Sequence, residues 1–565
     1  MYRQALGVLA QAAAAAVWLA SGTPVSAQQT KPASSLTEAN AVCAACHEVG
    51  EKMAGNAHAT VACSTCHVKH EEYPHPANIP KPVCSSCHSE QQTVFQLSVH
   101  AEAARKGNAG APDCAVCHSS AHETKKTGTV DFRRTTLETC GMCHDKVLAE
   151  YWTSVHGRAA ASGHARAPVC SDCHGEHDIR RPSNPDSRVA ARNQPETCGS
   201  CHAGVALRPR FAPPLDRIAS FEKSFHGLAL RAGSKTVAAC ASCHGVHNIL
   251  PSTDAKSQIH AANLAATCGK CHPGAGERFA SLGPVHVVEG RTEAEPVRWI
   301  RQFYLILIPL VLGLMFVHNL GDFLRKLWSL RLKPNAQPHR VVGPPDAELR
   351  MHAAERLQHA LLAVSFIVLT WTGFALIYPD HFWARPLTMW EDRWPVRGVV
   401  HRVSAVVFMI VAVLHVILTL RSPRLRHHWL ELIPRRQDLP EAVMNFSYNV
   451  GLRRTRPVLS SHSYIEKAEY WAVVWGAVIM AASGLLLWAN NWSLRNLPKV
   501  VLDIATAVHY YEAVLAAAAI VIWHFYFVLA DPEVYPMDSA WLTGKSVRRR
   551  KRHEQNETDT GKDTR

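Results

Sequence analysis

Five long apolar segments dominate the second half of the chain and determine its predicted architecture. They lie at about residues 300–320, 357–378, 398–420, 467–488 and 504–529. Each is long enough to cross a bilayer core of about 30 Å as an α-helix. Each is apolar on all its faces and the charged residues fall in the connecting loops, which argues against a buried soluble bundle. The pattern therefore predicts five transmembrane helices.

Another apolar stretch, residues 5–20, lies near the start of the 565-residue chain and follows the basic residue Arg3. The small residues Val25-Ser26-Ala27 are typical of a signal-peptidase site. We expect residues 1–27 to be a signal peptide that is cleaved before Gln28, with an uncleaved anchor helix as the alternative. In either case the segment that follows is exported.

The exported segment contains all 18 cysteines, and each belongs to a Cys-x-x-Cys-His motif. The nine motifs are Cys43/Cys46/His47, Cys63/Cys66/His67, Cys84/Cys87/His88, Cys114/Cys117/His118, Cys140/Cys143/His144, Cys170/Cys173/His174, Cys198/Cys201/His202, Cys240/Cys243/His244 and Cys268/Cys271/His272. In c-type haem attachment the two thiols bind the porphyrin and the histidine binds the iron. Zinc sites, disulfides and thiol redox pairs are the alternatives. Nine copies that use every cysteine favour nine covalent haem c groups.

Large aliphatic residues are sparse in residues 28–297. A small apolar core cannot offset the chain entropy that folding removes. We therefore expect the porphyrins to serve as the core, surrounded by short helices and long loops without a sizeable sheet. The predicted fold class is mainly α, with a loop-rich multihaem region followed by a five-helix transmembrane bundle.

The cysteine region is internally repeated. Ser98-Val99-His100, Ser154-Val155-His156 and Ser224-Phe225-His226 each place a histidine 14 residues before a motif, and each unit closes with a Thr-Cys-Gly motif. Further histidines recur just after the first motif of each unit. These seven repeated histidines, together with His58 and His286 at otherwise suggestive positions, are the nine candidate distal iron ligands, namely His58, His70, His100, His122, His156, His177, His226, His247 and His286. The remaining histidines of the region are His75, His164 and His260.

Bis-histidine iron has no free coordination site, so it passes electrons and does not bind substrate. The candidate ligands therefore favour a chain of electron carriers. The layout resembles tetrahaem cytochrome c3 and related multihaem families.

Basic residues between the spans predict the orientation in the membrane. They gather in the first loop, the third loop and the tail, at Arg325, Lys326, Arg331, Lys333, Arg340, Arg421, Arg424, Arg426, Arg435, Arg436, Arg453, Arg454, Arg456, Lys545, Arg548, Arg549, Arg550, Lys551 and Arg552. These segments are expected to be cytoplasmic, which puts the cysteine region in the periplasm. We expect a periplasmic domain at 28–297, a membrane domain at 298–532 and a basic cytoplasmic tail at 533–565.

Histidines inside membrane spans are rare and usually functional. The spans contain His318, His359, His401, His415, His509 and His524. His509 and His524 share the fifth span, about 22 Å apart along a regular helix. That helix could bind two haems, which would be b-type because no cysteine is nearby. Topology pairs His401 with His509 and His359 with His524, whereas a rival pairing uses His415 in place of His359.

The second to fifth spans resemble the di-haem cytochrome b subunits of formate dehydrogenase and nickel hydrogenase. The matching residues are Arg356-Leu357-Gln358-His359, Thr372-Gly373, His401-Arg402, Lys467 with Tyr470-Trp471, and His524-Phe525-Tyr526 with Pro532. The resemblance implies two b-haems bound by His359, His401, His509 and His524, and leaves His415 as a possible ligand. His318 lies in an extra span, and we interpret it as a satisfied interior histidine or one near a quinone.

The resemblance also implies a menaquinone site near the cytoplasmic haem. At the beginning of the fourth span that family carries an Asn and a Gln, whereas this chain has His462-Ser463-Tyr464-Ile465-Glu466-Lys467. His462, Glu466 and Lys467 are the candidate quinone-site residues here.

The whole arrangement resembles the CbcL-type inner-membrane multihaem cytochromes of metal-respiring bacteria. This implies a menaquinol dehydrogenase that passes electrons through b-haems and c-haems to periplasmic c-type cytochromes in anaerobic or extracellular respiration. Two alternatives are a quinone reductase fed by a periplasmic donor such as Fe(II), and a periplasmic reductase of a small oxyanion. The expected partners are the lipid bilayer, the quinone pool and periplasmic cytochromes, with no nucleic acid.

Overall fold

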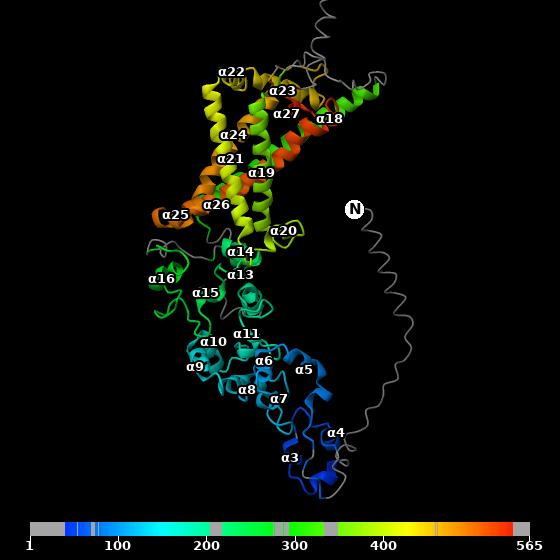
Figure 1. Cartoon of the computed structure of the whole chain (residues 1–565), viewed down its shortest axis with the longest axis vertical. Helices are drawn as coiled ribbons and strands as arrows, with labels where there is room; N and C mark the ends of the chain where they lie inside the picture. Colours follow the sequence, from blue (N-terminus) through cyan, green and yellow to red (C-terminus); the bar gives the residue numbers. More distant parts are fainter. Residues whose placement is uncertain are drawn as a thin grey trace, which may run out of the picture. The chain divides into compact units, whose positions relative to one another are not determined.

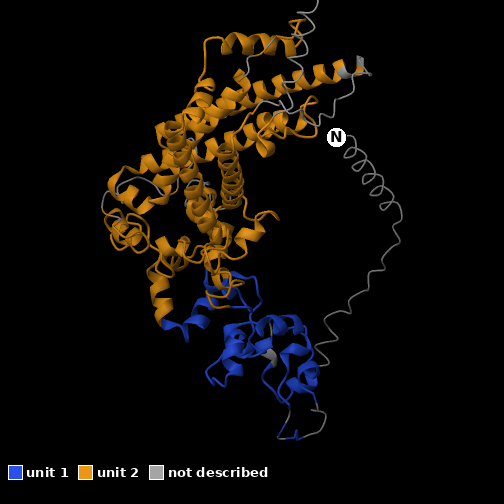
Figure 2. Cartoon of the chain, turned by 45° about the horizontal axis from the view of Figure 1, so that its top comes forward, with its two compact units in different colours: residues 1–145, 169–171, 175–179 blue, residues 146–168, 172–174, 180–565 orange. Residues whose placement is uncertain are grey.

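The structure is a computed structural model that describes residues 40–53, 55–68, 74–76, 78, 80–203, 217–274, 276, 286, 293–332, 349–457, 459 and 462–545. The chain divides into two compact units (Figure 2). Unit 1 comprises residues 1–145, 169–171 and 175–179, and unit 2 comprises residues 146–168, 172–174 and 180–565. The proposed signal peptide, His70 and most of the basic tail lie outside the described residues.

The cysteine region consists of short helices joined by irregular segments (Figure 1). They are α3 (Gly50–Met53), α4 (Cys63–Cys66), η1 (Cys84–Ser86), α5 (Ser89–Phe95), α6 (Val99–Arg105), α7 (Cys114–His118), α8 (Val130–Gly141), α9 (Asp145–Thr153), α10 (Val155–Ala161), α11 (Cys170–His174), η2 (Ala191–Asn193), α12 (Gln194–His202), α13 (Arg217–Lys223), α14 (Phe225–Arg231), α15 (Cys240–His244), η4 (Ala261–Asn263) and α16 (Leu264–Gly269). The buried hydrophobic residues of this region are mostly alanines, with Leu137, Val169 and Leu230 as the larger ones. Such a small core agrees with the expectation drawn from composition.

The repeated serine of each repeat begins a helix. Ser98, Ser154 and Ser224 are the N-caps of α6, α10 and α14, and each side chain accepts a hydrogen bond from the backbone N–H three residues later. An N-cap serine satisfies a donor that the helix itself leaves unpaired. The histidine two residues after each cap is thereby held in the first turn of a helix.

Two glycines lie where the chain packs too closely for any side chain. A Cβ added to Gly157 or Gly227 would lie 2.1 Å from the carbonyl oxygen of Tyr151 or Phe221, respectively. Both glycines follow directly after a repeated histidine, His156 or His226. The close approach fixes the helix that carries this histidine against the preceding helix.

The repeated threonine closes a loop in the last two repeats. Thr197 Oγ1 donates to the carbonyl of Arg188 at 2.7 Å, and Thr267 Oγ1 donates to the carbonyl of Gln258 at 2.8 Å. These equivalent bonds hold the second motif of each repeat in the same setting, so the sequence repeat is also a structural repeat.

Five helices of unit 2 are long and apolar enough to cross a membrane (Figure 1). They are α18 (Glu295–Leu332), α19 (Ala353–Ile377), α21 (Val396–Arg421), α24 (Tyr464–Trp488) and α26 (Lys499–Ala519), the last continued by η5 (Ile520–His524) and η6 (Tyr526–Ala530). α19 packs on α21, α24 packs on α26, and α18 packs on α26. Shorter helices between or after them are α20 (Arg385–Thr388), α22 (Pro423–Glu431), α23 (Asp438–Asn449), α25 (Asn490–Asn496) and α27 (Ala540–Thr543). The chain is a multi-pass membrane protein with five candidate spans.

Buried polar contacts attach α18 to the end of the fifth span. Lys326 Nζ binds Asp531 Oδ2 at 2.9 Å, and Tyr526 OH donates to Asp322 Oδ2 at 2.6 Å. Charged groups away from water are stable only when they are paired. These pairs therefore fix how α18 packs on the fifth span.

The fifth span is not a regular α-helix throughout. Residues 520–524 and 526–530 form π-helical turns, and π turns occur often at functional sites. In a regular α-helix the 15-residue separation of His509 and His524 would place the two side chains about 60° apart around the helix axis. A π turn is wider than an α turn, so this angle does not apply here. The turn reorients His524 relative to the α-helical part of the span.

The predicted mainly α fold is confirmed. In the part of the chain that the structure describes, the only β pairing is an isolated bridge between Leu349 and Lys545. Each predicted span falls on one of the long helices, with residue 378 one position past the end of α19, and α18 extends well beyond residues 300–320 at both ends.

Replacing Gly227 with alanine should destabilise the cysteine region by about 1–3 kcal/mol, because overpacking forces the backbone of Phe221 to move. Gly269→Ala is the matched control, since its added Cβ meets no atom within 4 Å. Guanidinium unfolding followed by circular dichroism measures the difference. Equal midpoints for the two variants would contradict the role given to this close approach.

Candidate haem sites

Each of the nine motif histidines faces one other histidine. The pairs are His47 with His75, His67 with His122, His88 with His58, His118 with His177, His144 with His100, His174 with His247, His202 with His156, His244 with His286 and His272 with His226. The ring centroids are between 5.9 and 6.4 Å apart. The same spacing therefore recurs at every motif.

This spacing fits a metal ion between the rings. A metal–imidazole bond is about 2 Å long and the nitrogen lies about 1 Å from the ring centre, so opposed rings on one metal have centroids about 6 Å apart. The pair His428 and His462 provides a contrast, since its centroids are 5.2 Å apart and its Nε2 atoms share a hydrogen bond of 3.3 Å. That pair has no room for a metal ion.

The helical turn at each motif suits porphyrin attachment. The helices α7, α11 and α15 each begin at the first cysteine and end at the motif histidine. Residues three apart lie on the same face of a helix, so both thiols can reach one porphyrin edge. No three His, Cys, Asp or Glu side chains of the described residues converge as a zinc site requires.

The thiols of the motifs form no disulfides, and many of them are exposed. All eighteen cysteines lie within the described residues, and none of them forms a disulfide. At the second position of the motif Cys173 and Cys243 are half-buried, whereas the other seven thiols are exposed, namely Cys46, Cys66, Cys87, Cys117, Cys143, Cys201 and Cys271.

This exposure differs from the usual setting of a cysteine, which is among the most buried residue types. Protein atoms leave most of the second thiols accessible to a covalent partner. Their attachment to haem stays a prediction.

The histidine pairs follow a regular pattern across the repeats. The histidine that an N-cap serine precedes faces the second motif of its own repeat, as His156 faces His202. The histidine that follows a first motif faces the first motif of the previous repeat, as His247 faces His174. Neighbouring repeats are therefore interlocked.

Eight of the nine predicted distal histidines face a motif histidine. The ninth, His70, lies outside the described residues, and His75 faces His47 instead. The motif at Cys43 stands outside the repeat, so the periodicity gave no signal for its partner.

Burial keeps several of these imidazoles neutral. It lowers the pKa of His156 to about 4 and also lowers the pKa of His100, His226 and His244. The nearby histidine of each pair lowers these pKa values further. A neutral imidazole is the form that binds iron.

Consecutive motifs lie side by side within each compact unit. In unit 1 a hydrogen bond with Cys170, together with burial, raises the pKa of Cys140. In unit 2 a hydrogen bond joins Cys198 and Cys240, and Cys173 lies close enough to Cys198 for the two thiols to interact electrostatically. The order of these sites in space therefore follows their order in the chain.

Four membrane histidines form two further pairs. His401 of α21 faces His509 of α26 at 6.4 Å, and His359 of α19 faces His524 at 6.2 Å. These are the same spacings as in the cysteine region. The four histidines belong to α19, α21 and α26 with its π-helical extension. α24 contributes no histidine to the pairs, but its side chains line the cavity around them.

Hydrogen bonds orient three of these rings. Nδ1 of His401 bonds Thr372 Oγ1 at 2.8 Å, and Nδ1 of His509 bonds Ser483 Oγ at 3.0 Å. Nδ1 of His524 lies 3.2 Å from Glu469 Oε2. Such contacts fix the tautomer and leave Nε2 available to a metal.

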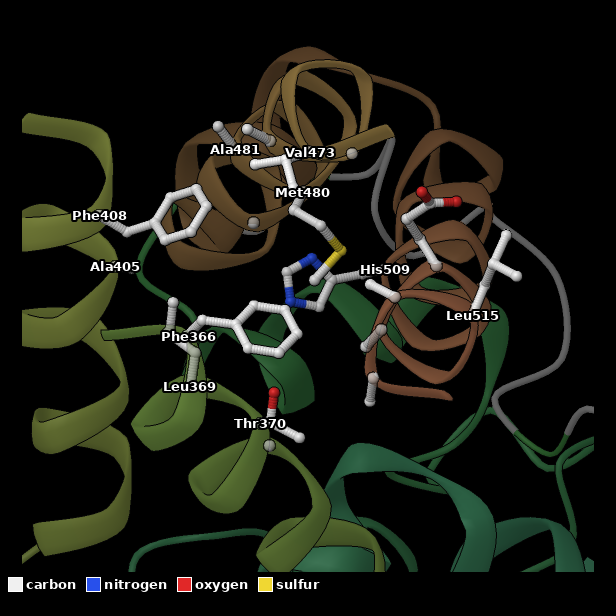
Figure 3. A pocket seen from close by; sticks show the side chains of 18 of the residues that line it. Phe366, Leu369, Thr370, Ala405, Phe408, Val473, Met480, Ala481, His509 and Leu515 are labelled. Atoms are coloured by element: carbon white, nitrogen blue, oxygen red, sulfur yellow. The ribbon is translucent and has the colours of Figure 1, made fainter. Parts of the chain in front are cut away.

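A cavity of about 3200 Å³ contains both membrane pairs. A site for one small molecule rarely exceeds about 1,000 Å³, so this space suits several groups. Figure 3 shows the His509 ring projecting into the cavity among Met480, Phe366 and Phe408. A Cβ added to Gly484 would lie 3.2 Å from His509 Cε1, so a side chain at this position would crowd the ring. The residues therefore fit two b-haems.

The other two membrane histidines have different partners. His415 binds Gln358 Oε1 through Nδ1 and Tyr470 OH through Nε2, both at 2.9 Å. His318 is buried and its Nε2 lies 2.7 Å from Tyr464 OH. Neither faces another of the membrane histidines, and His318 matches the satisfied interior histidine of our interpretation.

The three predicted quinone-site residues separate into two groups. His462 and Glu466 line the cavity near the N-terminal end of α24. Lys467 forms a buried ion pair with Asp438, with Nζ 2.7 Å from Oδ1. Its charge is therefore neutralised by Asp438.

Two cavity-lining residues at the same end carried no sequence signal. Nδ1 of His428 lies 2.9 Å from Glu355 Oε1, and this hydrogen bond raises the pKa of His428. The His428 ring also bonds His462, whose Nδ1 lies 2.8 Å from Glu431 Oε2. Because these residues come from three distant segments and match no motif, only the fold brings them together.

Residues 350–536 match the family model described as prokaryotic cytochrome b561, the nickel-hydrogenase cytochrome b family. This part of the chain is a cytochrome b membrane domain of the kind that transfers electrons and binds b-haem. No curated protein and no solved structure matches the chain.

Replacing His359 with alanine should remove one of the two b-haems, because His524 loses the ring that faces it. His415→Ala should retain both, since the His415 nitrogens are bound to Gln358 and Tyr470. The pyridine haemochrome spectrum of each purified variant gives the content of haem b. Loss of a b-haem from the His415 variant would support the rival ligand set.

Proposed function

We propose that this chain is an inner-membrane quinol dehydrogenase. In this proposal nine haem c groups occupy the exported region and two haem b groups occupy the membrane domain. Electrons leave menaquinol, pass through the membrane and reach periplasmic c-type cytochromes. One observation carries the proposal: a single cavity joins a polar end, both membrane histidine pairs and the ninth motif pair.

The cavity provides a place for quinol beside the pair His359 and His524. Its polar end is lined by Arg350, Glu355, His428, His462 and Glu466, among others. Glu469, which contacts His524, and Gln358, the neighbour of His359, line the same region. A quinol head group needs polar partners and its ring needs an apolar wall, and this cavity supplies both.

The polar end also supplies a route for protons. Oxidation of one quinol releases two electrons and two protons, and haem iron accepts electrons one at a time. The contacts from Glu355 through His428 and His462 lead to Glu431, which does not line the cavity and is about 38% exposed. We assign proton acceptance to His428 and His462.

The paired histidines favour a conduit over a terminal reductase. Within the described residues every motif histidine has a facing histidine, so no iron would keep an open position for a small oxyanion. The third candidate activity therefore has no supporting site.

The membrane potential favours outward flow. We place the ends of α21 and α24 nearest the cysteine region on the periplasmic side, as the exported cysteines and the basic loops require. An electron moving outward then moves toward the positive side, which releases about 2.3 kcal/mol per 100 mV. Inward flow from a periplasmic donor would have to oppose the same energy.

Menaquinol should reduce the b-haem and c-haem bands of the purified protein, and His428→Ala should slow this reduction about 10²-fold, as expected for loss of a proton acceptor. His427→Ala is the matched control because the neighbouring His427 side chain is about 80% exposed. Stopped-flow absorbance in the haem α-bands measures both rates.

No reduction of the parent protein by menaquinol would end the proposal of quinol oxidation. Equal rates in the two histidine variants would leave quinol oxidation intact but remove His428 from it.

A further inference from the structure

The ninth motif pair is attached to the membrane helices on both of its sides. His226 lies on α14, whose Arg231 donates from a guanidinium nitrogen to the carbonyl of Ile377 at 3.3 Å, at the end of α19. On the other side, His272 Nδ1 lies 2.9 Å from Asn491 Oδ1 on α25. The His272 ring and the helix that carries His226 are therefore each held by residues of the bundle.

The same pair opens into the membrane cavity. Cys268, His226 and His272 line the cavity that also contains His401 and His509. Among the described residues, no other motif histidine lines it. The ninth site is thus the point at which the two sets of histidine pairs share one space.

Further contacts hold the surrounding loop in place. Lys235 Nζ lies 3.5 Å from Asp392 Oδ2, and a Cβ on Gly274 would lie 3.7 Å from Arg495 Cδ. An exposed ion pair contributes little to stability, so the contact between Lys235 and Asp392 shows only that the two segments lie close together. The ion pair joins the segment after α14 to the segment before α21, and the close approach places Gly274, two residues after His272, against α25.

We propose that the ninth motif holds the gateway haem, through which every electron passes between the membrane domain and the exported region, and that Asn491 is its positioning residue. This inference rests on the proposed function. In the step itself one electron passes from the iron at His401 and His509, which becomes ferric, to the iron at His226 and His272, which becomes ferrous. No bond is made or broken.

The Asn491 amide oxygen can act on the iron only through His272. It accepts a hydrogen bond from the Nδ1–H group of His272, which fixes the tautomer and leaves Nε2 for the metal. An acceptor at Nδ1 also increases the basicity of the imidazole, which stabilises ferric iron and lowers the reduction potential. The residue therefore controls both the orientation and the potential of the gateway site.

Two substitutions should move the potential of one c-haem in opposite directions. Asn491→Leu removes the acceptor and should raise the potential, whereas Asn491→Asp supplies a stronger acceptor and should lower it. Asn496→Leu is the matched control. Asn496 is an exposed asparagine of the same helix, and its side chain donates to the backbone carbonyl of Trp492 within that helix. Redox titration of the full-length protein, followed in the c-type and b-type bands, measures these shifts.

The b-haem potentials should stay unchanged in all three variants, and only one c-haem in nine should shift. After menaquinol addition, Asn491→Asp should slow c-haem reduction severalfold while leaving b-haem reduction at its original rate. Unchanged c-haem potentials in both Asn491 variants, with menaquinol still reducing the protein, would overturn the gateway assignment alone. Failure of menaquinol to reduce even the b-haems would instead overturn the proposed function.

Discussion

The structure depends on one distance, the separation of about 6 Å between two imidazole rings that face each other. Eleven pairs keep it, nine in the cysteine region and two among membrane helices, although their surroundings differ completely. Hydrophobic packing alone would not reproduce the same spacing in a loop-rich cysteine region and in an apolar bundle. A shared chemical requirement explains the recurrence, and the haem iron of our proposal, held by both histidines of a pair, would meet it.

The remaining architecture serves these pairs. In the cysteine region serine caps and close glycine contacts hold short helices where a small core could not. In the membrane, hydroxyl groups of Thr372 and Ser483 hold the rings of His401 and His509. α18 lies outside the segment that matches the cytochrome b561 family and is joined to the bundle by buried ion pairs. Its role in this structure is to pack on the fifth span.

The sequence predicted whatever is encoded locally. Five apolar runs identify the long helices, and Cys-x-x-Cys-His needs no tertiary information to be recognised. Periodicity also identified seven of the nine distal candidates, because they recur at similar positions around the motifs, whereas His58 and His286 do not. It missed His75, which lies outside the repeat, and it gave no pairing order, because facing histidines often belong to different repeats.

Local sequence was least informative at the polar end of the cavity. The sequence made Lys467 a candidate for the quinone site, but its ammonium group is paired with Asp438 of an earlier helix. His428 and Glu355 carried no signal, although the fold makes them partners. The choice of His359 over His415 came from the family resemblance, since either could reach a haem in a regular helix. The structure adds contacts that distinguish them, because the His359 ring faces His524 whereas His415 is bound by Gln358 and Tyr470.

The interlocked repeats have a consequence for biogenesis. A first-motif histidine meets its partner only between 42 and 73 residues further along the chain, beyond the end of its own repeat. In the export that we propose for this region, each such site would stay incomplete until the residues that complete it have crossed the membrane. The last of them, at His244, is completed by His286, just before the first span. Maturation would thus advance in one direction along the polypeptide and finish only as the protein becomes anchored, so a shortened exported fragment would always end with an unfinished site.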